Sequence, residues 1–354
     1  MTEQKDTLKR IAKTLRSHPF VLPKYLQSPH LQTFSAFFVP SFKTNMPQLE
    51  KRYITLSDGA KLDADCFFQK NREEHATVVV LSGLEGYTKL GESLFAKSMT
   101  MKAYHFGFNV IHIKQRGEAD TMHLTEAIFA ADPSDDLSIA FDQFIQWRIK
   151  RMYLVGLSVG GWASLFTLSQ LKQSTKKYIT GAVAVSPPAN LIGTWKHVEK
   201  NRLYNWLLFQ TYKNMVNRRM KIDRPDKWDK QALKKSKSIR QFAEIFFPFS
   251  YGFKEKFVTI EGYHSKTDLT FLYSKMQIPI LLIHSQDDPV TPLASFMQSP
   301  INQYSNIITL FPLYGGHGGF FTSKKMYGDL DGHWAQNRAM EFVNLLESFH
   351  KSIA

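Results

Sequence analysis

Six short apolar runs, rich in β-branched residues, recur along the chain with room for a helix between successive runs. They lie at residues 77–81, 109–113, 152–155, 181–185, 278–283 and 307–311. Runs of this kind are typical of strands buried on both faces of a parallel sheet. Before them, the turn signal Asp58-Gly59 separates residues 52–56 from 62–68 and predicts an antiparallel hairpin. The predicted fold class is α/β, with a mostly parallel central sheet flanked by helices.

Composition divides the chain into a core and an insertion. Residues 196–240 hold 14 Lys and Arg against 4 Asp and Glu, together with several aromatic residues. We therefore expect a basic, aromatic helical cap at 190–274, inserted between two parts of one core at 51–189 and 275–354. Residues 1–50 are expected to form an amphipathic helix at 7–17, followed by an extended arm at 22–38. We favour docking of that helix on the core over binding to a membrane.

Charge and cysteine content narrow the class of protein. The net charge of +14 favours an anionic partner, which includes nucleic acid, an acidic lipid surface or an anionic substrate. No nucleic-acid recognition motif is present, so we do not expect nucleic acid. The single cysteine, Cys66, cannot form an intramolecular disulfide. Because no run approaches about 18 apolar residues and no secretory signal is visible, we expect a cytoplasmic protein, with peripheral binding to the inner face of a membrane as an alternative.

A Gly-x-Ser-x-Gly motif extends from Gly156 to Gly160, directly after one predicted strand and before a predicted helix at 162–171. Such a turn holds its serine in a strained backbone conformation, and the glycines leave room for crowded neighbours. We therefore predict that Ser158 is a nucleophile. In the alternative interpretation, the glycines only allow the strand and the helix to pack closely.

A serine nucleophile needs a base, and the base needs a carboxylate that orients it. Two carboxylates follow the fifth apolar run, and we favour Asp288 over Asp287 because of its distance from the strand end. After the sixth run, His317 lies among four glycines, a setting typical of a catalytic base rather than of a core histidine. The predicted triad is Ser158, Asp288 and His317. The other histidines, His284 among them, are expected to be structural or exposed.

Acyl transfer also requires backbone N–H groups that stabilise the oxyanion. We predict Val159, the residue after the nucleophile, and Leu84, in the glycine-rich loop after the first apolar run, as the two donors. A glycine-rich turn can equally hold phosphate, but neither a Gly-x-Gly-x-x-Gly nor a Walker pattern is present. We expect no cofactor and no metal site.

Several motifs together resemble the YheT-like branch of the α/β-hydrolases, over roughly residues 23–346. The resemblance rests on Pro29-His30-Leu31-Gln32-Thr33, Gly83-Leu84-Glu85-Gly86, Gln115-Arg116-Gly117, Ser238-Ile239-Arg240-Gln241-Phe242, Tyr251-Gly252-Phe253, Asp287-Asp288-Pro289 and Gly315-Gly316-His317-Gly318-Gly319-Phe320. It implies an α/β-hydrolase fold, a Ser-Asp-His triad and esterase or lipase-like activity on acyl esters. The chain departs from the family at Ser82, where histidine is usual, and in its more basic cap.

The predicted function is that of a serine hydrolase. It would cleave a small-molecule or lipid-like acyl ester through an acyl-enzyme on Ser158. Two alternatives remain open. The same triad would serve an acyltransferase that passes the acyl group to an alcohol or thiol, and the basic cap would suit a protein that binds an anionic membrane surface and carries an incidental triad.

Overall fold

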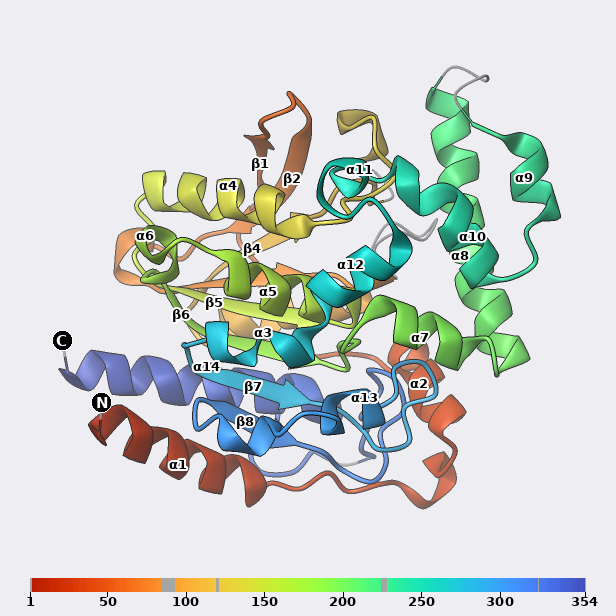
Figure 1. The fold of residues 1–354 in the computed structure, drawn as a ribbon. Helices are drawn as coiled ribbons and strands as arrows, with labels where there is room; N and C mark the ends of the chain where they lie inside the picture. The colour runs from red at the N-terminus through yellow and green to blue at the C-terminus, as the bar shows by residue number, and fades with distance from the viewer. Residues whose placement is uncertain (1, 85–92, 119–120, 224–227, 324, 354) are drawn as a thin grey trace.

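The computed structural model describes residues 2–84, 93–118, 121–223, 228–323 and 325–353 (Figure 1). In these residues eight strands form one sheet: β1 (Glu50–Thr55), β2 (Lys61–Phe67), β3 (Thr77–Leu81), β4 (Asn109–Lys114), β5 (Met152–Leu157), β6 (Ile179–Val185), β7 (Ile280–Ile283) and β8 (Ile307–Leu310). Their order is β1-β2-β4-β3-β5-β6-β7-β8. The pairs β1–β2 and β2–β4 are antiparallel and the others are parallel. The predicted mostly parallel sheet with a leading hairpin is confirmed.

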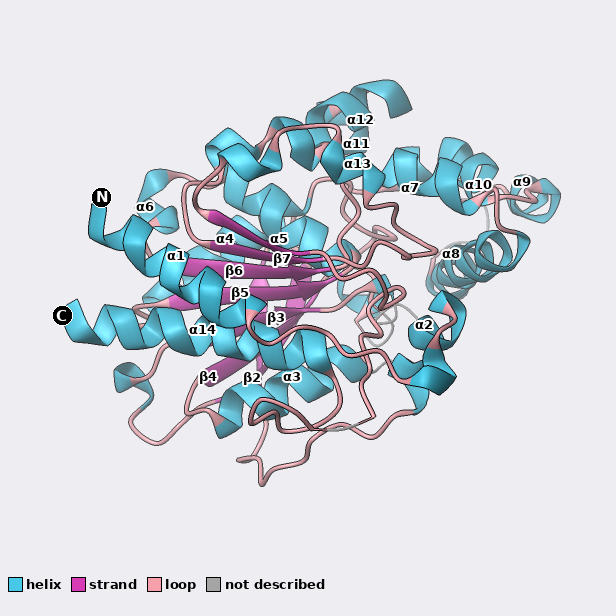
Figure 2. Ribbon diagram, turned by 90° about the horizontal axis from the view of Figure 1, so that it is seen from below, coloured by secondary structure: helices cyan, strands magenta, loops and turns pink. Residues whose placement is uncertain are grey.

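Each face of the sheet carries its own apolar core. Along β5, Met152 and Leu154 point to one core and Tyr153 and Val155 to the other, and all four are fully buried. This alternation follows from the two-residue period of a strand. Two sets of helices cover the faces (Figure 2): α1 (Thr2–Arg16), α3 (Leu94–His105) and α14 (Trp334–Ile353) on one, and α4 (Pro133–Gln146), α5 (Val159–Gln170) and the short α6 (Gln173–Lys176) on the other.

The N-terminal helix α1 is docked on the core. Its apolar stripe, which includes Leu8, Ile11 and Leu15, is buried, and the helix lies against α14. The stripe is therefore not available to a membrane. Elsewhere in the described ranges, too, the structure contains no helix with the length and apolar character needed to cross a bilayer.

The extended arm predicted at residues 22–38 is wrong over most of its length. A 3-10 turn at Lys24–Leu26 is followed by the helix α2 (Pro29–Phe38). Pro29 occupies the first turn of this helix, where its fixed φ suits the helix and its missing N–H costs nothing. The prolines of this segment therefore mark the start of a helix rather than exclude one.

The chain between β6 and β7 forms further helices beyond the carboxyl ends of the parallel strands (Figures 1 and 2): α7 (Leu191–Val198), α8 (Arg202–Ile222), α9 (Lys230–Lys235), α10 (Ile239–Phe246), α11 (Phe253–Lys256) and α12 (Ile260–Thr267). A short helix, α13 (Ala294–Met297), follows β7. Many aromatic side chains of the inserted segment pack on one another; Phe247, for example, packs edge-on against Trp195 and Tyr263. These rings form an interior for the insertion and join it to the core beneath.

Candidate active site

Ser158 lies at the sharp turn between β5 and α5. Its backbone has the positive φ of 52°, a region that side chains rarely adopt. A Cβ on Gly156 would lie 2.4 Å from the carbonyl oxygen of Gly160, and one on Gly160 would lie 2.3 Å from that of Ser82. Both positions therefore require glycine, which explains why the motif has this form.

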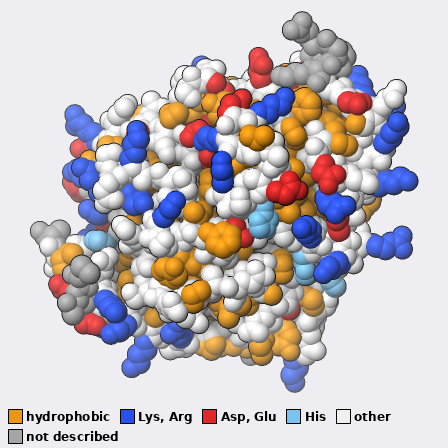
Figure 3. Space-filling model, in the orientation of Figure 1, with side chains coloured by type: hydrophobic (Ala, Val, Ile, Leu, Met, Phe, Trp, Pro, Cys, Tyr) orange, Lys and Arg blue, Asp and Glu red, His pale blue; other side chains and the backbone are white. Residues whose placement is uncertain are grey.

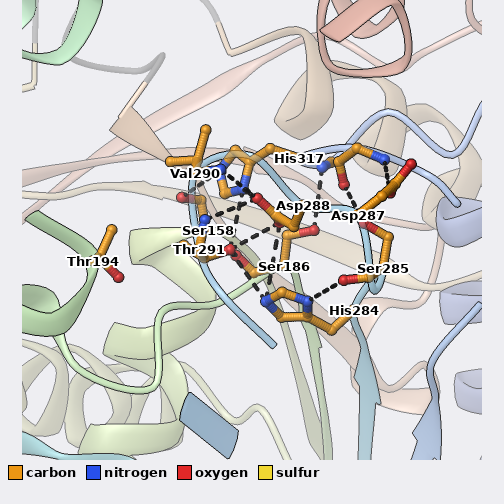
Figure 4. Close-up of polar contacts among 12 residues, drawn as sticks. Ser158, Ser186, Thr194, His284, Ser285, Asp287, Asp288, Val290, Thr291 and His317 are labelled. Carbon is orange, nitrogen blue, oxygen red and sulfur yellow. Dashed lines mark hydrogen bonds and ion pairs between the residues drawn. The ribbon is translucent and has the colours of Figure 1, made fainter. Parts of the chain in front are cut away.

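Ser158, His317 and Asp288 form a continuous chain of polar contacts (Figure 4). The Ser158 Oγ lies 2.9 Å from His317 Nε2, and His317 Nδ1 lies 2.9 Å from Asp288 Oδ2. Because an ionised carboxylate can only accept, Nδ1 carries the proton and Nε2 is left to accept the hydroxyl proton of Ser158. The structure thus brings together the three residues predicted as a triad, which come from three separate loops at the same edge of the sheet.

The carboxylate of Asp288 is fully buried and held by several donors. Its Oδ1 accepts hydrogen bonds from the backbone N–H groups of Val290 and Thr291, each at 2.8 Å, and its Oδ2 accepts one from the Thr291 hydroxyl at 2.8 Å. Burial acts to raise the pKa of Asp288, but the attraction of His317 and these hydrogen bonds outweigh burial and hold the pKa below its ordinary value. Asp288 is therefore ionised at neutral pH.

Asp287 has a different role from its neighbour. Its Oδ1 accepts a hydrogen bond at 2.9 Å from the backbone N–H of Gly316, the residue before His317. The two adjacent carboxylates therefore have different partners. Asp288 contacts the imidazole of His317, and Asp287 accepts a hydrogen bond from the backbone just before it. The contact of Asp287 with Gly316 was not predicted from the sequence.

A second buried histidine lies beneath Asp288. The Nδ1 of His284 donates to the carbonyl oxygen of Ser285 at 2.9 Å, and its Nε2 lies 3.1 Å from the Thr291 hydroxyl. Burial lowers the pKa of His284, although the charge of Asp288 opposes this shift. His284 is thus a neutral, structural residue that lies against Thr291, whose single hydroxyl proton is donated to Asp288.

Helix α2 is hydrogen-bonded to the loop that carries His317. The Thr33 hydroxyl accepts a hydrogen bond at 2.9 Å from the backbone N–H of His317 and donates one at 2.8 Å to the carbonyl oxygen of Pro29. The Gln32 side chain holds both backbone groups of Phe321, donating to its oxygen at 3.1 Å and accepting from its nitrogen at 2.9 Å. The sequence signal for these two residues was the Pro29–Thr33 motif, which did not show what they would contact.

The glycines around His317 allow this close approach. A Cβ on Gly319 would lie 2.0 Å from the carbonyl oxygen of Gln32, and one on Gly316 would lie 2.4 Å from that of Pro29. Gly316 also has a φ of +59°, which a side chain would strain. Contact with α2 therefore explains two of the four glycines, Gly316 and Gly319.

Helix α2 also contacts the inserted helices. The Nδ1 of His30 lies 3.0 Å from the hydroxyl of Tyr204 on α8, and the rings of Phe34 and Tyr204 stack with centroids 6.4 Å apart. One short helix thus joins the His317 loop on one side to α8 on the other.

The two predicted oxyanion donors lie close to Ser158. Val159 is the first residue of α5, and the near contact between Gly160 and Ser82 brings the loop of Leu84 against this turn. Both Leu84 and Val159 line the same cavity as Ser158 and His317. Glu85 and Gly86, which complete the motif of this loop, lie outside the described residues.

A cavity of about 630 Å³ adjoins Ser158 and His317, and its lining is mainly apolar. Side chains from α2, α3 and the inserted helices form much of its wall, including Phe34, Phe95, Leu191, Trp195, Leu207 and Leu208. Among the described lining residues the charged side chains, apart from histidine, are Lys43 and Lys97, and none is acidic. Nor do the described residues include a group of three His, Cys, Asp or Glu side chains that could hold a metal ion.

The fold is similar to that of known hydrolases, although no protein-family model matches the sequence. A solved esterase from Pyrococcus furiosus superposes with a TM-score of 0.54, covering 87% of this chain and 96% of that chain, at 16% identity. This is the α/β-hydrolase fold.

Curated sequences relate this chain to named enzymes. Phospholipase ABHD3 of Bos taurus is 26% identical over 293 residues, which cover 79% of this chain and 68% of the relative. Monoacylglycerol lipase ABHD2 of Homo sapiens is 20% identical over 361 residues, which cover 94% of this chain and 82% of the relative. These similarities support a place in the α/β-hydrolase superfamily.

Proposed function

We propose that the protein is a serine hydrolase that cleaves acyl esters. The observation that carries this proposal is the chain of polar contacts from Ser158 through His317 to Asp288 beside an apolar cavity. It supplies a nucleophile, a base and an orienting carboxylate in the geometry that ester cleavage needs. The names of the similar proteins, a phospholipase, a monoacylglycerol lipase and an esterase, agree with it.

In the proposed reaction, Ser158 Oγ attacks the ester carbonyl carbon while His317 Nε2 takes the hydroxyl proton. Asp288 stabilises the imidazolium that forms. The tetrahedral intermediate then breaks its bond to the alcohol oxygen, which receives the proton from Nε2. Water attacks the resulting acyl-enzyme with His317 again as base, and this step releases the acid and restores Ser158.

The oxyanion would be stabilised by the backbone N–H groups of Val159 and Leu84. The N–H of Val159 is free for this purpose within its helix, because the first N–H groups of a helix have no intrahelical partner. Each donor of this kind contributes about 3 kcal/mol to stabilisation of the transition state.

We further propose a lipid-like acyl ester as the substrate. An acyl chain lying along Trp195, Leu207 and Leu208 would gain about 0.8 kcal/mol for each CH₂ removed from water. We therefore expect kcat/KM to rise with acyl-chain length until the cavity is filled.

We also propose that the chain belongs to the YheT-like branch, because of the motifs that end at Thr33 and surround Leu84 and His317.

Covalent labelling tests the proposal directly. A fluorophosphonate probe should add one adduct to the wild type, as measured by intact mass, and none to Ser158→Ala. Ser41→Ala is a matched control, since Ser41 lines the same cavity but belongs to no part of the proposed triad. Labelling of Ser158→Ala, or absence of an adduct on folded wild type, would contradict the proposal.

A further inference from the structure

Helix α2 and the first turns of α8 expose large apolar side chains at the end of the molecule opposite the two termini (Figures 1 and 2). On α2, Leu31 is 50% exposed and Phe38 is 81% exposed; on α8, Leu203 is 45% exposed and Trp206 is 57% exposed. We call these four residues the docking face. Scattered apolar residues are normal on a surface, but a cluster of this size and type indicates a binding surface.

The four residues lie at one end of the molecule. The contacts of Tyr204 with His30 and Phe34 hold α8 against α2. On each helix the exposed residues share one side, because Leu31 and Phe38 are seven positions apart and Leu203 and Trp206 are three apart. Each helix therefore has one side with exposed apolar side chains.

Basic residues flank the two helical segments in the sequence, and acidic residues are nearly absent from these segments. The exposed side chains of Lys24, Lys43, Lys200 and Arg202 lie just before or after the two helical segments in the sequence. No Asp or Glu occurs between Asp6 and Glu50 or within α8, and half-buried Glu199 is the nearest acid to the start of α8. Figure 3 shows Lys and Arg side chains projecting along the edge of the molecule where α8 and α9 lie.

The docking face meets the opening of the cavity beside Ser158. Phe38 and Lys43 both line that cavity and are both exposed, so the cavity reaches the surface next to them. A molecule held against the docking face would therefore have a short apolar path to Ser158.

We propose that the docking face binds the surface of an anionic lipid bilayer. Trp and Leu side chains insert at the boundary between headgroups and acyl chains, while the flanking Lys and Arg contact acidic headgroups. The basic residues that flank α2 and the start of α8, and the lack of carboxylates within these segments, favour this partner over a neutral surface. Delivery of an ester from the bilayer to Ser158 rests on the proposed function, but binding to the bilayer does not.

Vesicle sedimentation tests the proposal with the full chain. Wild type should bind vesicles of phosphatidylcholine mixed with phosphatidylglycerol and not vesicles of phosphatidylcholine alone.

Arg202→Gln should weaken binding about fivefold, since a basic residue near such a surface contributes about 1 kcal/mol. Trp206→Ala should weaken it about tenfold through lost apolar contact. Tyr53→Ala is the matched control, because Tyr53 is a 49% exposed aromatic on the edge strand β1, and it should bind as wild type does.

Three results would overturn the proposal. These are absence of binding to the anionic vesicles, equal weakening by Trp206→Ala and Tyr53→Ala, and a dimer in sedimentation velocity that Trp206→Ala dissociates, which would assign the face to a second copy. Hydrolysis of a water-soluble short-chain ester without vesicles reports on Ser158 separately. Its persistence in a protein that fails to bind vesicles would leave the proposed function standing.

Discussion

Thr33 accepts a hydrogen bond at 2.9 Å from the backbone N–H of His317, which follows it by 284 residues in the chain. The same hydroxyl donates to the carbonyl oxygen of Pro29, so the direction of its lone pairs is set by α2. The position of the imidazole therefore depends on a helix that contributes no group to the proposed triad.

We expect Thr33→Val to lower kcat by about tenfold with little change in KM. The substitution leaves the backbone N–H of His317 without its acceptor, at a cost of about 1–3 kcal/mol. Thr33→Ser keeps the hydroxyl and should restore most of the activity. Steady-state kinetics on a soluble ester measure both variants, and equal activity of Thr33→Val and wild type would contradict the positioning role.

The adjacent carboxylates should respond very differently to the same substitution. Asp288→Asn should lower kcat by about 10⁴-fold, because the amide no longer fixes the tautomer of His317 or stabilises its cation. Asp287→Asn keeps an oxygen for the Gly316 N–H and should lower kcat by no more than about fivefold. If the two variants lost activity equally, the assignment of Asp288 as the acid would be wrong.

His284 should make the protein less stable in mild acid. Its pKa is lowered from the ordinary 6.5 by burial, so the folded protein keeps it neutral where the unfolded chain binds a proton. The free energy of unfolding should therefore fall as pH drops below 6.5, by at most about 1.4 kcal/mol per pH unit from this group.

Urea unfolding of wild type and His284→Asn between pH 7 and 5 measures this effect as the difference between the two slopes. His123→Asn serves as the control for the substitution itself, because His123 is exposed. A His284→Asn slope equal to that of wild type would show that His284 takes no part in the pH dependence.

Filling the cavity should change the preference for acyl-chain length. Leu207 on α8 is half-buried and lines the cavity, so Leu207→Trp would occupy part of its volume. We expect kcat/KM for a long-chain ester to fall about tenfold, roughly the loss of two buried CH₂ groups, while an acetate ester is cleaved as before. An equal fall for both esters would place the acyl chain elsewhere.

Local sequence patterns were sufficient to predict the sheet and the turn that carries Ser158. The apolar runs are recognised from residues that are close together in the chain. The same is true of the glycines on either side of Ser158. The predicted strand starts differ from the structure by up to two residues. The run at 278–283, for example, becomes β7 only from Ile280, after Pro279, which has no N–H to donate to a neighbouring strand. Asp288 and His317 were also predicted from local signals, the distance of Asp288 from a strand end and the four glycines around His317; their catalytic roles stay predictions.

The supporting contacts could not be predicted in this way. Thr33 and Asp287 both hold the His317 loop, but their partners lie far away in the sequence and show no shared periodicity with them. His284 was expected only to be structural or exposed. Its place beneath Asp288 depends on the tertiary fold, which brings the Thr291 hydroxyl close to both residues. Such contacts follow from the tertiary fold, whereas strands and turns follow mainly from local sequence.

The bond between Thr33 and His317 also has a consequence for biosynthesis. A ribosome makes α2 near the beginning of this sequence and the His317 loop near its end, and most of the sheet is made between them. A nascent chain can therefore hold Ser158 in its turn before any base has been synthesised to activate it. The proposed activity would begin only when the last strand is in place and the two distant segments meet, so incomplete chains should be inert toward esters.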